Sequence, residues 1–175
     1  MGLDMYLYKV KRSGDFPNRL FVKICWHLFS LELINNQKLG EYFQDYTYKV
    51  DVDGVEEEHL VCKIGYWRKA NMIHNWIYEN CATTHQADYD LIIVERTKLM
   101  ELLDICRIIL QAKEEILNGN SSKAKELLPT KSGFFFGSLE YNQGYIEDLE
   151  HSVKILETTL HNLTEQEDVF YLADY

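Results

Sequence analysis

Apolar and polar residues alternate along the first ten positions of the chain, and a similar pattern returns near its end. Residues 2–10 and 168–175 are therefore predicted to be strands, because the side chains of a strand point alternately to the two faces of a sheet. Residues 42–52 and 55–63 predict a hairpin, since the Asp53-Gly54 pair between them is a common two-residue turn. A further compact strand is predicted over 89–95.

In other segments apolar residues recur every three to four positions, which is the spacing of a helix with one buried face. The predicted helices cover 19–36, 65–81, 97–117 and 140–162, with a short helical turn at 122–128. In the 65–81 helix the expected core face consists of Tyr66, Ala70, Ile73 and Ile77. No repeat or low-complexity linker interrupts the pattern. The sequence thus predicts a single α+β domain over residues 1–175, with a mixed or antiparallel sheet packed with about four helices.

A second stripe of side chains runs beside this core face at helical spacing: Trp67, Asn71, His74 and Tyr78. Each of them combines an apolar or planar body with a hydrogen-bonding tip, which suits the wall of a pocket. We therefore expect the four side chains to surround a hollow that a solute can enter. For His74 a second interpretation stays open, a flank histidine bonded to a backbone carbonyl or a carboxylate.

Two cations, Arg68 and Lys69, fall in the first turn of the predicted 65–81 helix. Cations there oppose the helix dipole by roughly 0.3–1 kcal/mol each, whereas an anion would be favoured by both the dipole and the free N–H groups. The pair is therefore a candidate anion site. The alternative is that Arg68 pairs with one of the acidic residues at 56–58.

Residues 129–137, Pro-Thr-Lys-Ser-Gly-Phe-Phe-Phe-Gly, are predicted to form a glycine-bracketed loop and strand. Lys131 and Ser132 are candidate phosphate contacts, and Phe135 would face away from its two neighbours, where it can stack on a ring. Core packing of all three phenylalanines is the competing interpretation. Tyr141 and Tyr145 are spaced four residues apart on the next helix, so they either wall the same pocket or form a packed aromatic pair.

Charge and composition narrow the classes of partner. The 175 residues carry 28 acidic and 18 basic side chains, a net charge of −10, and the basic residues form no patch of the kind that duplex nucleic acid requires. No apolar run reaches membrane-spanning length and no signal peptide is visible. The four cysteines are widely spaced without a Cys-x-x-Cys, which is typical of a reduced, cytoplasmic protein. No catalytic, cofactor or metal motif is present.

Three segments in the same order resemble a family of small, uncharacterised proteins encoded by bacteriophages and prophages. They are the opening Gly-Leu-Asp-Met-Tyr-Leu at 2–7, the Tyr-Trp-Arg-Lys-Ala-Asn-Met-Ile-His-Asn-Trp at 66–76, and the Leu-Leu-Pro-Thr-Lys-Ser-Gly-Phe-Phe-Phe-Gly at 127–137. The chain differs in carrying Asn142 after Tyr141, where relatives often have an acidic residue, and in a last strand that ends on Tyr175 rather than Trp. The resemblance implies a phage setting, in which small acidic proteins intercept host factors or host defence signals.

These observations lead to one hypothesis and two rivals. The hypothesis is a cytoplasmic binding protein that sequesters a small anionic, nucleotide-like host immune signal, without a cofactor. Its ligand-binding residues would be Trp67, Arg68, Lys69, Asn71, His74, Tyr78, Lys131, Ser132, Phe135, Tyr141 and Tyr145. The rivals are a protein–protein inhibitor of a host defence enzyme and an enzyme acting on a nucleotide or phosphate compound, with His74 as acid or base. The sequence leaves open whether the partner is a host protein or a second copy of the chain.

Overall fold

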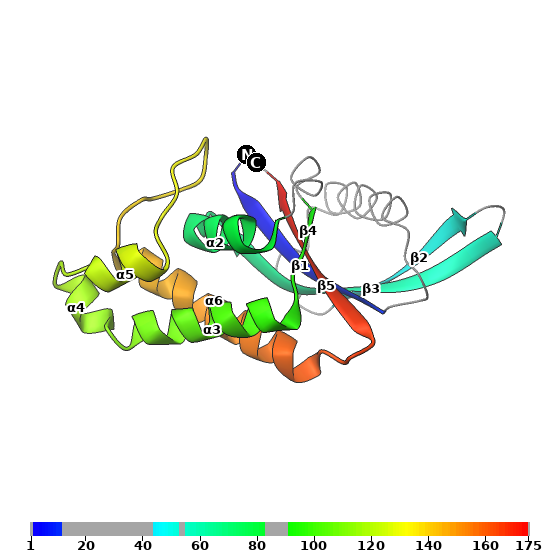
Figure 1. Cartoon of the computed structure of the whole chain (residues 1–175). Coiled ribbons are helices and arrows are strands. Elements are labelled where there is room, and N and C mark those ends of the chain that lie inside the picture. Colours follow the sequence, from blue (N-terminus) through cyan, green and yellow to red (C-terminus); the bar gives the residue numbers. More distant parts are fainter. Residues whose placement is uncertain (1, 12–43, 53–54, 83–90, 175) are drawn as a thin grey trace.

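Five strands form one antiparallel sheet in the order β2-β3-β1-β5-β4 within residues 2–11, 44–52, 55–82 and 91–174, which are the residues that this computed structural model describes (Figure 1). The strands are β1 (Asp4–Lys11), β2 (Gln44–Val52), β3 (Val55–Arg68), β4 (Leu91–Ile93) and β5 (Glu167–Asp174). The predicted hairpin is confirmed, because β2 and β3 pair up to Val52 and Val55. The predicted 19–36 helix and the Asp53-Gly54 turn itself lie outside the described residues.

The first strand of the chain lies in the middle of the sheet. Tyr6 of β1 is opposite Tyr66 on β3 and opposite Leu172 on β5, so β1 is hydrogen-bonded along both edges. Met5 and Tyr8, which point to opposite faces, are both buried. Both faces of the middle of β1 are therefore covered, whereas an alternating pattern by itself requires only one buried face. The first and last described strands are therefore neighbours, and the two ends of the chain lie together (Figure 1).

The described helices are α2 (Asn71–Cys81), α3 (Arg96–Leu110), α4 (Lys113–Leu117), α5 (Ser122–Leu127) and α6 (Gln143–Asn162). The two longest, α3 and α6, pack against each other, and α6 also packs on β3. Gly65 permits the second contact, since a Cβ at that position would lie 2.6 Å from the Ile155 side chain of α6. The predicted α+β fold, an antiparallel sheet packed with helices, is confirmed.

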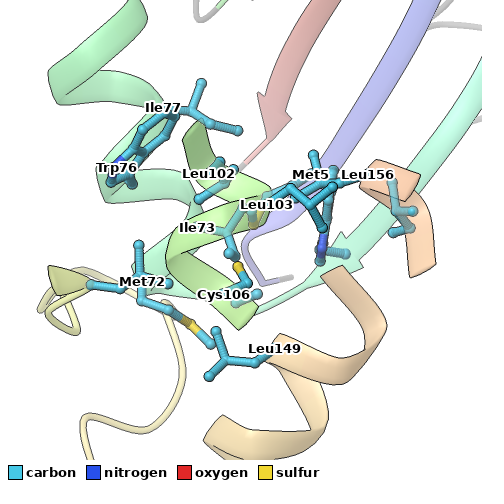
Figure 2. Close-up of a cluster of buried hydrophobic side chains, with 14 of the residues drawn as sticks. Met5, Met72, Ile73, Trp76, Ile77, Leu102, Leu103, Cys106, Leu149 and Leu156 are labelled. Atoms are coloured by element: carbon cyan, nitrogen blue, oxygen red, sulfur yellow. The ribbon is translucent and has the colours of Figure 1, made fainter. Parts of the chain in front are cut away.

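The hydrophobic core lies between the sheet and these helices. Figure 2 shows side chains from β1, α2, α3 and α6 meeting in one cluster, and Met5, Ile73, Leu102 and Leu156 in it are completely inaccessible to solvent. Truncating a buried Leu or Ile in such a cluster to Ala typically costs about 2–5 kcal/mol of stability. This cluster buries the apolar faces of the helices and one face of the sheet.

The prediction of a single helix over 65–81 is wrong at its beginning. Residues 65–68 are the end of β3, where Trp67 pairs with Met5 of β1, and the helix starts only at Asn71. The chain turns between them at Lys69, whose φ of 63° no right-handed helix contains. Tyr66 and Trp67 are aromatic residues that suit a strand as well as a helix, so their local preference does not decide between the two. The backbone pairing with β1 decides for the strand. Ala70, Ile73 and Ile77 are buried as predicted, but Tyr66 belongs to the sheet.

The other helix boundaries differ less from the predictions. The predicted 97–117 helix is divided into α3 and α4 at Gln111 and Ala112. The short helix at 122 and the last strand are confirmed. The last long helix starts at Gln143 rather than near 140, because the side chain of Asn142 caps it by accepting hydrogen bonds from the N–H groups of Gly144 and Tyr145.

Candidate functional site

The four side chains of the expected pocket stripe do not surround a hollow. Trp67 lies on β3 at 1% exposure, and its Nε1 donates a hydrogen bond to Ser152 Oγ of α6 at 2.9 Å. Asn71 and His74 are also buried, at 2% and 6% exposure, and only Tyr78 reaches the surface. The predicted stripe requires all four residues to lie on one helix. Trp67 lies on a strand instead, so its side chain does not share a helix face with the other three.

Asn71 instead holds a loop in place. Its Nδ2 donates hydrogen bonds to the carbonyl oxygens of Phe136 at 3.1 Å and Ser138 at 2.8 Å, and its Oδ1 accepts one from the N–H of Lys131 at 2.9 Å. Both amide donors and one acceptor position are thus used by backbone groups far away in the sequence. We call residues 129–141 the aromatic loop, and Asn71 is its clamp.

His74 contacts the same loop through the ring of Phe136. Its Nδ1 lies 2.8 Å from the hydroxyl oxygen of Tyr171 on β5, and the ring of Phe136 stands edge-on to the imidazole at 5.2 Å. Burial, with a smaller contribution from the positive charge of Lys131, lowers the pKa of His74 to about 4. The imidazole is therefore neutral at pH 7, and it attracts no phosphate there.

The two tyrosines hold the base of the loop. Tyr145 donates a hydrogen bond from its hydroxyl to the carbonyl of Leu128 at 2.9 Å, and burial raises its pKa. Tyr141 accepts one from the N–H of Thr130 at 3.1 Å, and the two tyrosine rings are 5.0 Å apart. Tyr141 lies before α6 rather than on it, which corrects the predicted helical pair. Its ring contact with Tyr145 corresponds to the packed-pair alternative.

The tip of the aromatic loop is apolar and faces solvent. Phe134 is 81% exposed and Phe135 is 48% exposed, with their ring centroids 4.2 Å apart. Only Phe136 points inward and packs on the core. The segment contains a turn at 134–135 instead of the predicted strand, so neither strand alternation nor core packing of all three rings describes it. Paired exposed aromatic rings are uncommon on a surface with no binding role.

The backbone of this tip is strained. Phe135 has a φ of 62°, which is a genuine outlier for a bulky side chain, and such a conformation costs about 1–3 kcal/mol. The only other non-glycine residue with positive φ among the described residues is Lys69, in the corner between β3 and α2. Gly137 packs against that corner so closely that a Cβ would lie 2.9 Å from the Cβ of Lys69.

The N-terminal segment joins the two strained positions. Leu3 donates its N–H to the carbonyl of Phe135 at 3.4 Å and accepts a hydrogen bond from the N–H of Lys69 at 2.7 Å. Three segments distant in sequence, around residues 3, 69 and 135, thus meet at one junction beside α2. Figure 1 shows the aromatic loop projecting next to α2, near the two chain ends. These hydrogen bonds and the close contact with Gly137 hold the strained backbone at Lys69 and Phe135 in place.

The predicted cations lie around this junction, but not in a helix turn. Arg68 Nε is 3.9 Å from Asp4 Oδ1, and Lys131 Nζ is 3.8 Å from Glu79 Oε1. Lys69 is exposed in the corner, and Ser132 is exposed in the loop. Loose, solvated ion pairs of this kind contribute little to stability, roughly 0–1 kcal/mol each. Of the predicted site residues, four belong to the aromatic loop (Lys131, Ser132, Phe135 and Tyr141) and four contact it (Lys69, Asn71, His74 and Tyr145). Trp67 and Arg68 instead contact Ser152 and Asp4, and the ring of Tyr78 packs on His74.

A cavity that the sequence did not reveal lies at the other end of α6. It has a volume of about 800 Å³ and opens between the β4–α3 connection, residues 93–97, and the α6–β5 connection, residues 163–169. Arg96 ties the two connections together, because its guanidinium donates hydrogen bonds to the carbonyls of Leu163 and Leu160. In the sequence, residues 163–167 lie between the predicted last helix and the predicted last strand, and nothing in them indicates a cavity.

Neither a known protein family, nor a curated protein, nor a solved structure matches this chain. Among the described residues, no group of three or more His, Cys, Asp or Glu side chains is placed to hold a metal ion. No helix in the described ranges combines the length and the apolar character needed to cross a bilayer.

Proposed function

We propose that this protein binds a partner protein through the aromatic loop, with Phe134 and Phe135 as the anchoring side chains. The observation that carries the proposal is the 81% exposure of Phe134 on a loop whose backbone is held by Asn71. The resemblance to phage proteins makes a host protein the expected partner, and inhibition of a host defence enzyme the expected consequence.

The energetics support an anchoring role. Burying a phenylalanine side chain that was exposed contributes about 1.5–3 kcal/mol, and aromatic residues at the centre of an interface commonly carry much of its affinity. A loop already fixed in its bound conformation also loses little entropy on binding. The clamp by Asn71 and the junction with Leu3 supply that fixation before any partner arrives.

The experiment compares proteins retained from a bacterial lysate by the wild-type chain and by two variants. Phe134→Asp changes the loop tip, and Ile108→Asp is the matched control, an exposed residue on α3. A partner that depends on the loop is retained by wild type and by the control but not by Phe134→Asp. Once purified, that partner should bind the Phe134→Asp variant at least about tenfold more weakly, a loss of 1.4 kcal/mol or more.

Equal retention by all three chains would refute the role of the loop. Binding to phospholipid vesicles that disappears with Phe134→Asp would instead assign the two rings to a membrane surface. Both outcomes can be read without knowing the partner in advance, because the control variant differs from the test variant only in the position of the added charge.

A small anionic, nucleotide-like ligand is the second candidate. It is supported by Lys131 and Phe135, since a cation and an accessible ring within one loop could hold phosphate and stack a base. Calorimetry with cyclic and linear nucleotides tests it: heat that is lost on Lys131→Ala and on Phe135→Ala would favour this candidate, and absence of heat would exclude it. Conversion of a nucleotide during the titration would indicate an enzyme.

A further inference from the structure

Two unlike surfaces lie at opposite ends of α6. The aromatic loop precedes this helix, at the end that carries α5 in Figure 1. The 800 Å³ cavity lies at its other end, where the chain passes into β5. A helix of 20 residues is about 30 Å long. The loop is clamped at its own end by Asn71, so it does not reach the cavity of the same molecule. Any contact between the two surfaces has to join two copies of the chain.

The cavity and the loop are chemically complementary. Apolar side chains line part of the cavity, among them Ile93, which is 40% exposed. Its charged lining consists of four carboxylates and one cation, so it is acidic overall: Glu95, Glu165, Glu167, Asp168 and Arg96. The loop presents the opposite combination, two exposed phenylalanine rings flanked by Lys131 within the loop and by Lys69 in the adjoining corner. Apolar surface would meet apolar surface, and positive charge would meet negative charge.

The cavity is also large enough to accept the tip of the aromatic loop. Sites that enclose a ligand have volumes of roughly 300–1,000 Å³, and the cavity lies within this range. The two phenylalanine rings form one compact wedge, because their centroids are only 4.2 Å apart. The net charge of −10 opposes association of copies, but at physiological salt this repulsion is screened beyond about 8 Å, so that close local contacts prevail.

We propose that the aromatic loop of one copy docks into the cavity between the β4–α3 and α6–β5 connections of a second copy. The proposal rests on the function proposed above, that the loop is a protein-binding element, and it names a second copy as the occupant in the absence of the other partner. The contact is head-to-tail, because the two copies contribute different surfaces. A partner that takes the loop would then dissociate the assembly.

Sedimentation velocity over a range of concentrations tests the proposal with four full-length chains. Wild type should show a mass that increases with concentration. Phe134→Asp removes the wedge, Ile93→Asp places a charge in the cavity, and each should weaken association at least about tenfold. Ile108→Asp, the matched control on α3, should associate as wild type does.

Mixing the two defective variants provides the decisive measurement. The Ile93→Asp chain keeps an intact wedge and the Phe134→Asp chain keeps an intact cavity, so an equimolar mixture should form a complex of two chains that grows no further. A symmetric interface, in which both copies use the same surface, would not be restored in this way. Failure of the mixture to associate would overturn the proposal.

The two proposals fail in different ways. If wild type keeps the monomer mass at every concentration while Phe134→Asp still loses its lysate partner, docking into the cavity is wrong and the loop remains the partner-binding element. If Phe134→Asp neither loses a partner nor alters the mass, both proposals are wrong. Mass that rises equally in wild type and Ile93→Asp would place the self-contact elsewhere on the chain.

Discussion

The polar side chains of α2 and the apolar tip of the aromatic loop reverse the usual distribution of residues. Asn71 and His74 are polar and buried, whereas Phe134 and Phe135 are apolar and exposed, and the two pairs lie on either side of the same junction. The buried pair has its hydrogen bonds satisfied by the fold, so it has little capacity left for a ligand. The buried polar side chains of α2 therefore have a structural role, which is to hold the aromatic loop. The exposed rings of that loop form the surface that we propose to be functional.

The largest effect is expected from removing the clamp. Asn71→Ala deletes three hydrogen bonds to backbone groups and leaves the N–H of Lys131 without its partner, so the free energy of unfolding should fall by about 3 kcal/mol. Urea titration measures it. Asn80→Ala on the same helix is the control, because that amide bonds only the carbonyl of Trp76 near the surface, and it should cost about 1 kcal/mol or less. Equal losses would mean that Asn71 is no clamp.

A comparable effect is expected from protonating His74. Its pKa in the folded chain is lowered to about 4 from an ordinary value of 6.5, so the stability that depends on the neutral imidazole is complete above pH 6.5 and is lost as the pH falls toward 4. This loss should amount to about 3 kcal/mol. His74→Gln should remove that part of the pH dependence, whereas His161→Gln on the exposed end of α6 should leave it unchanged.

Relieving the strain at Phe135 should change stability and binding in opposite directions. Glycine adopts positive φ freely, so Phe135→Gly should raise the free energy of unfolding by up to about 1 kcal/mol while it weakens the partner complex. Phe134→Gly is the matched control within the same turn, and it lacks the positive φ. A control that gains as much stability as Phe135→Gly would show that the strain at Phe135 is negligible.

The smallest effect on stability should come from the most exposed ring. Phe134→Ser removes a side chain that contributes little to the core, so the free energy of unfolding should stay within about 0.5 kcal/mol of wild type. Chemical unfolding and partner binding are measured on the same preparation. A marked loss of stability would show that the ring is a structural element, and the contrast with Asn71 would then disappear.

Some elements could be predicted from the local sequence because their residue pattern is compatible with only one type of secondary structure. The strand at the start of the chain, the β2–β3 hairpin and the short helix at Ser122 are confirmed. The segment 65–68 was assigned to a helix because Tyr66 and Trp67 fit both periods, and only β1, some sixty residues earlier in the chain, decides between them. Similarly, strand alternation predicts that Phe135 alone faces away from its neighbours, but which of the three rings faces solvent depends on the turn at 134–135 and on the hydrogen bonds of Asn71.

By itself, the order of residues determined the α+β class and the positions of most elements, and it drew attention to Asn71, His74 and the phenylalanines of the loop. These properties depend on periodicity and turn-forming residues, that is, on residues close to one another in the sequence. The roles of those side chains were decided only by the tertiary structure. Whether Asn71 binds a solute or a loop depends on which backbone groups arrive within about 3 Å of it, and those groups come from residues some sixty positions away.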